Sequence, residues 1–353
     1  MDTKFKILEK KRFWAGILLA QFLLFFLLSK MDIAVVFFQS FFERQKKFHQ
    51  KLFSFPSFSL GDIFYIFTGI FIILILLKIS KKPTRNKGII QLLISLNIFY
   101  CLYQIFWGML YFQEPLIKIL DSKEPTLQEK KELAFKYLSK CKKDRKIVQE
   151  DKNGVFKIYH LEKIEKEILQ NQKHLPAEFP HKKGTDIHSL KPSFFGKIMS
   201  YTGILGYYNP FSAEAHYNEN LPSTQLPFTL AHESAHQMGF AREQEANFIG
   251  YLIGKNSKNS ELRYSTNYYV LKSLLKNIEK KDSLFVTKFI ENYSTEMKRD
   301  RNYEKAFAAK HRGALNTFFG ITNDLFLKSN QQDGSVTYSY FVDLLVRYER
   351  KNP

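Results

Sequence analysis

Residues 227–239 read PFTLAHESAHQMG, and the rest of the fold has to accommodate this stretch. His232 and His236 are four residues apart, so on a helix they lie one turn apart on the same face. Two imidazoles on one helix face can bind a single zinc ion. Glu233 follows the first histidine directly. It is expected beside the ion, where a base can take a proton from a water molecule that the zinc activates.

The residues around the two histidines predict a buried helix. Residues 229–231, 234, 235 and 237 are uncharged, and Met238 is apolar. Proline precedes the expected helix start, and Gly239 stands where a helix C-cap belongs. The alternative is a chance His-Glu-x-x-His pattern on an ordinary amphipathic helix, and a nearby third ligand makes that alternative the weaker one.

The expected third ligand is an acidic residue just after the Gly239 turn. Glu243 and Glu245 cannot both face the metal, because two residues on a helix are about 200° apart. We favour Glu243, since its face also carries the small residues Ala246 and Gly250, which permit a close approach to the histidine helix. Asn247, one turn further on, is expected to hydrogen-bond the second nitrogen of a ligating histidine. An ordinary polar contact on the helix face is the alternative for this side chain.

Three apolar segments in the first third of the chain predict a membrane anchor over residues 1–112. The predicted spans are about residues 13–28, 60–77 and 89–112, each long enough to cross a hydrocarbon core of about 30 Å. The first follows a basic start and lacks a good cleavage context, so we interpret it as an uncleaved span.

Charge placement predicts the topology of this anchor. The basic loop of residues 78–87 and the basic N-terminus are typical of cytoplasmic segments, which leaves everything after residue 112 outside the cytoplasm. Arg44, Lys46, Lys47 and Lys51 lie between the first two spans and oppose this assignment. The same connection holds an amphipathic piece, residues 34–42, expected on the membrane surface.

Residues 113–353 predict one mostly helical domain with a small β element. Thr126 and Glu129 form a capping box that opens a helix running to about Cys141. A second apolar stripe spans residues 161–169, residues 175–193 have the composition of a loop, and residues 204–217 are expected to hold a short strand. Further helices are expected from about Glu261, Ser283, Asn302 and Val336. The expected fold class is therefore mainly α: three transmembrane helices followed by a zincin-like domain.

The net charge of +19 does not by itself indicate a nucleic-acid partner. The basic residues are scattered, and the densest runs, residues 142–146 and 182–183, show no interleaving of arginine with aromatic residues. We therefore expect no nucleic acid and an attraction to anionic lipid near the anchor. The two cysteines, Cys101 and Cys141, cannot build a disulfide framework.

The motif His232-Glu233-x-x-His236 followed by Glu243-x-x-Ala246-Asn247 resembles that of the gluzincin metallopeptidases. The layout as a whole resembles an uncharacterised bacterial family of membrane-anchored His-Glu-x-x-His proteins whose function is unknown. That second resemblance covers nearly the whole chain. Besides the site it is carried by residues 206–211 (GYYNPF), 323–328 (NDLFLK) and the pair Asp333-Gly334.

The resemblances imply a zinc metallopeptidase in a bacterial cytoplasmic membrane. Zinc would be held by His232, His236 and Glu243, with Glu233 as the catalytic base acting on a peptide or protein substrate. A non-catalytic membrane sensor or scaffold with a zinc-binding domain is the alternative, but it has no need of Glu233. A channel or transporter is weaker still, because the predicted spans carry no charged residue in their interiors.

Upstream of the motif, zincins usually carry an edge strand that aligns the peptide. His216, Tyr207 and Tyr208 lie in this region, and each has the chemistry to stabilise an oxyanion. Packing within a loop is the favoured interpretation for all three.

Overall fold

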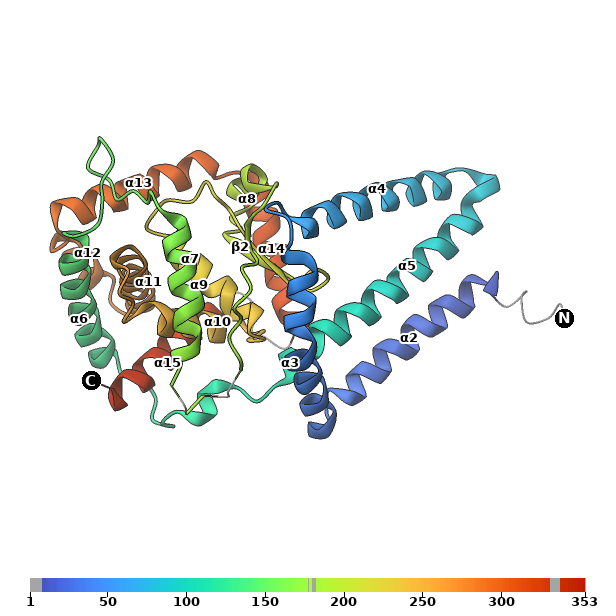
Figure 1. Ribbon diagram of the computed structural model, residues 1–353, viewed down its shortest axis with the longest axis horizontal. Helices are drawn as coiled ribbons and strands as arrows, with labels where there is room; N and C mark the ends of the chain where they lie inside the picture. The colour runs from blue at the N-terminus through green and yellow to red at the C-terminus, as the bar shows by residue number, and fades with distance from the viewer. Residues whose placement is uncertain (1–7, 177, 180–181, 331–336, 353) are drawn as a thin grey trace. The chain divides into compact units, whose positions relative to one another are not determined.

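The apolar segments of the first third fold into long helices. The structure is a computed structural model and describes residues 8–176, 178–179, 182–330 and 337–352 (Figure 1). Helices α2 (Lys11–Leu28), α4 (Leu60–Ser80) and α5 (Arg85–Phe106) are long and apolar enough to cross a membrane. Three membrane-spanning helices were predicted, and this is confirmed at the level of length and composition.

The third apolar helix lies earlier in the chain than the predicted span, because α5 begins at Arg85 and ends at Phe106, against predicted bounds of 89 and 112. Gly108 lies two residues after the helix end and is pressed against Gln104, so a side chain there would clash with it. Residues Gly108–Phe112 then tighten into the 3-10 helix η2. A stretch of apolar composition therefore contains a change of helix type that hydropathy does not register.

The helices divide into two compact units, and α5 is the centre of the first. Unit 1 comprises the residues up to Gln113 together with Asn209–Ala213. Within it α5 packs against both α2 and α4, and the Asn97 amide of α5 bonds Gln21 and the Trp14 carbonyl of α2. Phe211 packs against the rings of Phe64 and Phe99.

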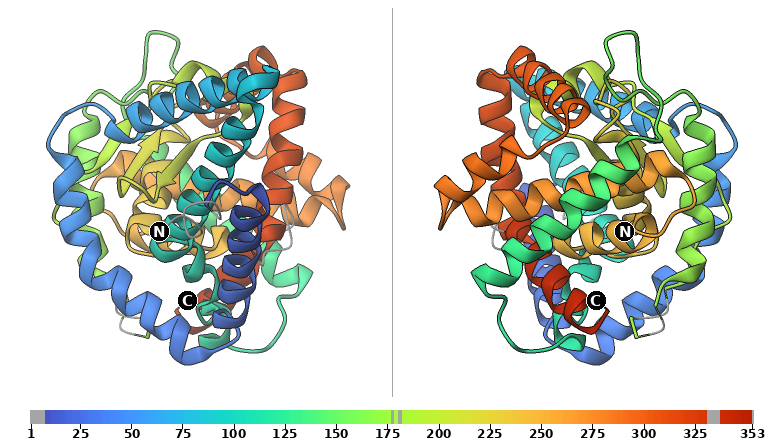
Figure 2. Two further views of the ribbon diagram at one scale, coloured as in Figure 1. Left: turned by 90° about the vertical axis from the view of Figure 1, so that its right-hand side faces the viewer. Right: turned by 90° about the vertical axis from the view of Figure 1, so that its left-hand side faces the viewer.

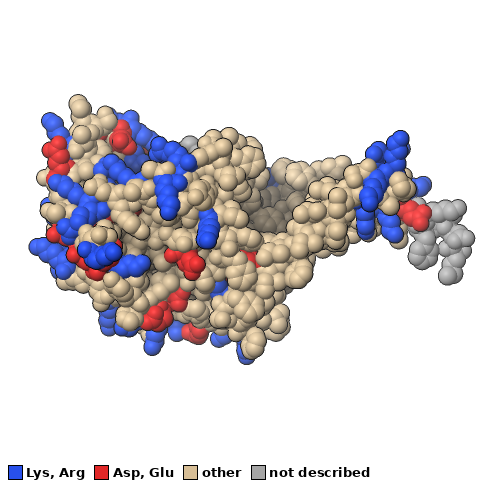
Figure 3. All heavy atoms as spheres, turned by 90° about the horizontal axis from the view of Figure 1, so that it is seen from above, with Lys and Arg blue, Asp and Glu red and all other residues tan. Residues whose placement is uncertain are grey.

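Helix α3 (Asp32–Ser54) is much longer than the amphipathic piece expected at residues 34–42. Its buried positions, Val35, Phe42, Lys46 and Gln50, recur at helical spacing along one stripe. Lys46 is paired with Glu43, so one of the basic residues of this connection is buried and neutralised. Figure 3 shows Lys and Arg side chains gathered at the end of unit 1 that carries the loop between α4 and α5.

Unit 2, formed by residues 114–208 and 214 onward, is mostly helical, as the sequence predicts. The capping box at Thr126 and Glu129 is confirmed, and the helix that it opens runs four residues beyond Cys141. The helices of this unit are α6 (Leu127–Arg145), α7 (Leu161–Asn171), α8 (Gly196–Thr202), α9 (Leu226–Gln237), α10 (Glu243–Gly254), α11 (Ser260–Glu279), α12 (Ser283–Glu291), α13 (Thr295–His311), α14 (Ala314–Ser329) and α15 (Thr337–Lys351), with short 3-10 helices at Leu116–Ile119 and Gln172–His174.

The C-terminal helices differ from the sequence prediction in number and start. Where one helix was expected from Asn302, α13 begins at Thr295 and α14 follows it after a short turn. Ser294 caps α13 by accepting a hydrogen bond from the Met297 amide, which explains the earlier start. Asp333 and Gly334, two residues that carry the family resemblance, lie outside the described residues.

The β element is a three-stranded sheet in the order β1-β3-β2 (Figure 2). Strands β2 (Gly206–Asn209) and β3 (Glu214–Tyr217) lie within the region where one short strand was predicted. Strand β1 (Leu190–Pro192) pairs in parallel with β3 and lies in a segment predicted to be loop. A three-residue strand next to proline and lysine leaves almost no period-2 pattern to detect.

Helix α9 occupies the middle of unit 2. It packs against α10, α11, α7, β1 and β3, and every one of its residues except His232 is buried. The small residues Ala231, Ser234 and Ala235 have less than 1% of their surface exposed, which lets neighbouring backbones come close. The predicted mainly α class with a small β element is thus confirmed, with the histidine helix at its core.

Asp300 and Arg145 form a fully buried ion pair that fastens α13 to α6. The Asp300 carboxylate accepts hydrogen bonds from Arg145 Nε at 2.6 Å, Tyr264 Oη at 2.7 Å and the Phe156 amide at 2.9 Å. A buried charge held by this many donors is stable only while its partner is present.

We expect Asp300→Ala to lower the free energy of unfolding by about 3–5 kcal/mol, because it leaves the buried Arg145 guanidinium with the partly exposed Glu150 as its only acidic partner among the described residues. The matched control is Glu114→Ala, which breaks the exposed pair with Lys118 and should cost less than about 1 kcal/mol. Urea denaturation of the full chain in detergent micelles, followed by circular dichroism, compares the two. Equal losses in the two variants would contradict this description of the core.

Candidate metal centre

Helix α9 presents its two histidines from a rigid, enclosed position. Pro227 lies in the first turn, where the missing amide hydrogen is not needed. The helix ends at Gln237, and Gly239 adopts a φ of 97°, a backbone conformation that favours glycine. The chain reverses there and starts α10 at Glu243 four residues later. The predicted glycine turn after the motif is therefore present, and it sends α10 back along α9.

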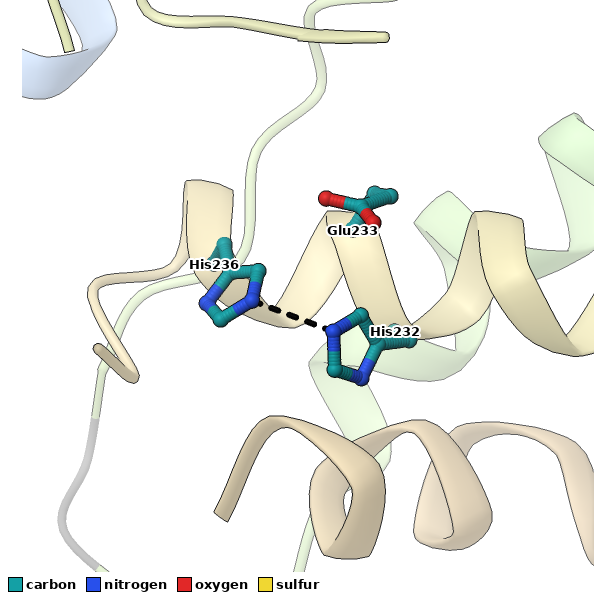
Figure 4. Close-up of side chains that lie close together, drawn as sticks. All are labelled: His232, Glu233 and His236. Carbon is teal, nitrogen blue, oxygen red and sulfur yellow. Dashed lines mark hydrogen bonds between the residues drawn. The ribbon is translucent and has the colours of Figure 1, made fainter. Parts of the chain in front are cut away.

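The imidazoles of His232 and His236 point at one another (Figure 4). Their Nε2 atoms are 3.1 Å apart. Nδ1 of His236 lies 2.7 Å from the Phe240 carbonyl oxygen. A carbonyl can only accept, so Nδ1 carries the proton, and in the neutral ring Nε2 presents its lone pair to the site. The turn after α9 therefore sets His236 in the tautomer that a metal ligand requires.

Glu243 completes a set of three converging donor atoms. Its Oε2 lies 3.4 Å from His232 Nε2, and its Oε1 lies 3.7 Å from His236 Nε2. This approach depends on Gly250, where an added Cβ would lie only 3.1 Å from the His232 backbone nitrogen. The sequence argument for a small face on α10 is in keeping with this packing.

The spacing of the three donors fits one tetrahedral zinc ion. With zinc–ligand distances of about 2.0–2.1 Å, tetrahedral geometry places neighbouring donors about 3.3 Å apart. The two Nε2 atoms are 3.1 Å apart. The Glu243 carboxylate lies 3.4 Å from His232 Nε2 through Oε2 and 3.7 Å from His236 Nε2 through Oε1, so the shortest distances between the three groups lie around that value. Two imidazoles and one carboxylate are also a donor set that zinc commonly takes in sites with one position left for water. His232, His236 and Glu243 thus fit the group that the sequence implies.

Glu245 is turned away from the histidines and serves the fold. Its carboxylate accepts a hydrogen bond from the Leu116 amide at 3.0 Å and from Arg242 at 3.1 Å. The side chain is 5% exposed, so it satisfies a buried backbone donor at the start of unit 2. The structure therefore places the Glu243 carboxylate beside the histidines and the Glu245 carboxylate beside the Leu116 amide.

Asn247 lies on the same helix face as Glu243. Its side chain is buried and is among the groups that raise the pKa of His232. No described residue forms a hydrogen bond with His232 Nδ1 within the usual distance and angle limits. Asn247 is near enough to act on that ring, and the predicted bond to the second nitrogen stays a prediction.

Glu233 stands beside the histidines on the opposite side from α10. Its donor atoms group with those of His232 and His236 within 4.8 Å. The carboxylate lies against Gly206 at the start of β2, where an added Cβ would be 2.5 Å from Oε1. No described residue donates a hydrogen bond to its Oε2, although the side chain is 97% buried. A buried carboxylate oxygen without a donor is costly, which marks a place where a missing ligand or water is expected.

Glu233 is the less suitable of the two acids as a metal ligand. The pKa of Glu233 is raised to about 8, mainly by burial, with His232 opposing the rise and Glu243 adding to it. Burial raises the pKa of Glu243 as well, but the hydrogen bond with His232 and the charge of His236 outweigh it and hold the pKa below its ordinary value. Glu243 is thus the acid kept as a carboxylate, and Glu233 is the acid ready to hold a proton.

The two carboxyl groups also act on the histidines and favour a positive charge between the two rings. Burial works to lower the pKa of His232, yet Glu243 and Glu233 raise it above its ordinary value. Burial and the neighbouring His232 lower the pKa of His236 to about 4. One imidazole is thus drawn toward the charged form and the other is held neutral. A cation between them would take the place of that single proton.

The candidate oxyanion residues lie on the small sheet. His216 is fully buried on β3, and its ring stacks on Tyr207 of β2 at 4.6 Å. Its neighbour Glu214 forms a buried ion pair with Lys191 at 2.6 Å. These contacts are packing contacts, but they lie within the sheet and not within a loop as predicted, because Tyr207 and Tyr208 belong to β2 and His216 belongs to β3.

Two contributors to the site escaped the sequence reasoning. Gly206 supports the Glu233 carboxylate, and the Phe240 carbonyl orients His236. A glycine at the start of a strand is a general sign of close approach by another group and could have been noticed. The carbonyl of a phenylalanine has no signature in a sequence.

A family model described as a protein of unknown function (DUF3810) matches residues 37–346, and the chain belongs to that family. The match includes the metal centre and most of the anchor. No curated protein and no solved structure matches the chain.

We expect the full chain to bind about one zinc ion, and His232→Ala or Glu243→Ala to lose it, because each removes one of three converging donors. Glu245→Ala is the matched control on the same helix. It should keep its zinc but unfold more easily, by about 1–3 kcal/mol, because the Leu116 amide loses its acceptor. Elemental analysis after dialysis against a weak chelator measures the metal. Zinc lost from Glu245→Ala but kept by Glu243→Ala would contradict the assignment.

Proposed function

We propose that this member of the DUF3810 family is a membrane-anchored zinc metallopeptidase. The observation that carries the proposal is the arrangement around α9: three converging donors on one side, and a buried acid with no donor to its Oε2 on the other. A purely structural metal site has no use for that second acid. A sensor or scaffold that binds zinc is the competing function, and the tests below separate the two.

The residues of the chain supply the acid–base chemistry. When bound by His232, His236 and Glu243, zinc would act as a Lewis acid toward a water molecule and a substrate carbonyl group. Glu233 would accept a proton from the attacking water at its carboxylate and return it to the nitrogen of the leaving amine. The amide C–N bond breaks, water is added across it, and Glu233 ends in its starting state.

The edge strand β2 supports a peptide as the substrate. It is the outer strand of the sheet order β1-β3-β2, and its first residue, Gly206, touches Glu233. An extended peptide can pair with the outer side of an edge strand through backbone hydrogen bonds. A peptide paired there would run beside the Glu233 carboxylate.

Glu233→Gln should keep its zinc and lose at least about 100-fold in hydrolysis, because an amide cannot accept the proton. The assay uses the full chain in detergent micelles with fluorescently quenched casein or a mixed peptide library. Zinc content is measured on the same sample. If the wild type cleaves and Glu233→Gln cleaves equally well, the mechanism is wrong. If zinc is bound and neither protein cleaves any peptide, the sensor function takes its place.

Gly206→Ala should also reduce hydrolysis while zinc is retained, because the new methyl group would force the Glu233 carboxylate to move. Gly320→Ala is the matched control, since no atom lies within 4 Å of a Cβ built at that glycine. Rates are compared at equal zinc content. Unchanged activity in Gly206→Ala would show that the support of Glu233 by β2 is unimportant.

We further propose that the loop of residues 78–87 lies in the cytoplasm of a bacterial cell and unit 2 outside it, across the cytoplasmic membrane. Within unit 1 this loop and the N-terminal end of α2 lie at the same end of the helices, and both are basic (Figure 1). A reporter that matures only outside the cytoplasm should be active when it is fused after residue 353. Activity of a cytoplasm-specific reporter at that position would overturn the assignment.

A further inference from the structure

The apolar side chains of helix α14 point away from the rest of unit 2. Leu315, Phe318, Ile321 and Leu325 are 55%, 60%, 60% and 61% exposed. At about 100° per residue they share one stripe of about 120° on the helix surface. We call this stripe the α14 apolar face. Of the residues of α14, all of which the structure describes, only Leu327 is buried, and it lies on the opposite side.

The side of α14 that faces the rest of unit 2 is polar. The helix packs against α8, and a Cβ added at Gly203 would lie 2.6 Å from the Asn316 amide nitrogen. Asn316 and Leu327 lie on the same side of the helix, opposite the α14 apolar face. A helix that stabilises a soluble core has the reverse polarity. Burial of apolar surface within unit 2 therefore does not explain why α14 carries apolar residues at these positions.

Helix α8 extends the exposed apolar surface. Ile198 and Tyr201 are 57% and 44% exposed, and Leu205 follows at the end of the next turn. The Tyr201 ring contacts the His311 ring at 4.8 Å, which ties α8 to the end of α13. Other exposed large apolar residues in the described part of unit 2, such as Phe135, Ile147 and Leu284, lie far apart in the sequence. A contiguous apolar surface of this kind marks an interaction site on a protein.

The charge around this surface is positive. Residues 305–329 contain Lys305, Lys310, Arg312 and Lys328 and a single acidic residue, Asp324, which pairs with Lys328 at 2.7 Å. All four basic side chains are exposed. An apolar stripe bordered by lysine and arginine is complementary to a bilayer with anionic headgroups.

We propose that the α14 apolar face docks on the bilayer that holds this chain, with α14 lying in the membrane interface. The 16 residues of α14 give a length of about 24 Å, which is too short to cross a hydrocarbon core of about 30 Å. Because the anchor holds the chain at the bilayer, the effective concentration of the α14 apolar face at the membrane is high. The proposal requires neither zinc nor hydrolysis.

The test places an environment-sensitive fluorophore at residue 318 of the full chain. Phe318→Cys is labelled in a background with Cys101→Ala and Cys141→Ala, and the protein is reconstituted in vesicles of phosphatidylcholine and phosphatidylglycerol. We expect blue-shifted emission and several-fold quenching by lipids with a spin label on the acyl chain. The matched control is Leu284→Cys, at an isolated apolar residue of α12 that is 75% exposed. It should show neither effect.

Two outcomes would overturn the proposal. Water-like emission at residue 318 in vesicles would show that the face stays in solvent. Blue-shifted emission without quenching by spin-labelled lipid would show that protein covers it, either a second copy or another part of the chain. A second variant, Leu325→Glu with the label at residue 318, should weaken the quenching without changing zinc content, and unchanged quenching would count against docking.

Discussion

The candidate site depends on the close packing of α10 on α9 at Gly250. A Cβ at that position would lie 3.1 Å from the His232 backbone nitrogen, so the two helices would have to shift by a few tenths of an ångström, which would move Glu243 relative to the imidazoles. The Gly239 turn makes the approach geometrically available, because it reverses the chain within a few residues. A single helix–helix contact thus converts a local sequence motif into three converging donors.

Burial of so many polar groups in the middle of a fold is unfavourable unless each has a partner. Glu245 and His236 each have one: Glu245 accepts a hydrogen bond from the Leu116 amide, and His236 donates one to the Phe240 carbonyl. At the site itself, Glu233 Oε2 and His232 Nδ1 are the exceptions among the described residues, and of these two only Glu233 is an acid. This asymmetry distinguishes a site adapted to chemistry from one that merely holds the structure together, and it is why we favour a hydrolase over a zinc-binding scaffold.

The sequence predicted the parts of the molecule that depend on strong, local signals. The three apolar helices, the capping box at Thr126 and the glycine turn after the motif all follow from neighbouring residues, and all are present. The choice of Glu243 over Glu245 rested on helix periodicity, and the structure places the two carboxylates accordingly. Strand β1, the end of α5 at Phe106 and the separate helix α14 depend on tertiary contacts or on short elements with little periodicity. The assignment of residues 209–213 to the anchor unit could not be foreseen, because it rests on Phe211 finding aromatic partners far away in the chain.

The most direct test of the central claim is a zinc K-edge X-ray absorption spectrum of the purified full chain. It reports which atoms surround the metal, whatever the substrate. The account predicts nitrogen and oxygen neighbours at about 2.0–2.1 Å, with the outer-shell scattering of two imidazoles. His236→Ala, which removes one of the three donor groups, should lose the zinc signal altogether. Sulfur neighbours at about 2.3 Å, or a shell without imidazole, would contradict the proposal that α9 and α10 together form the metal centre.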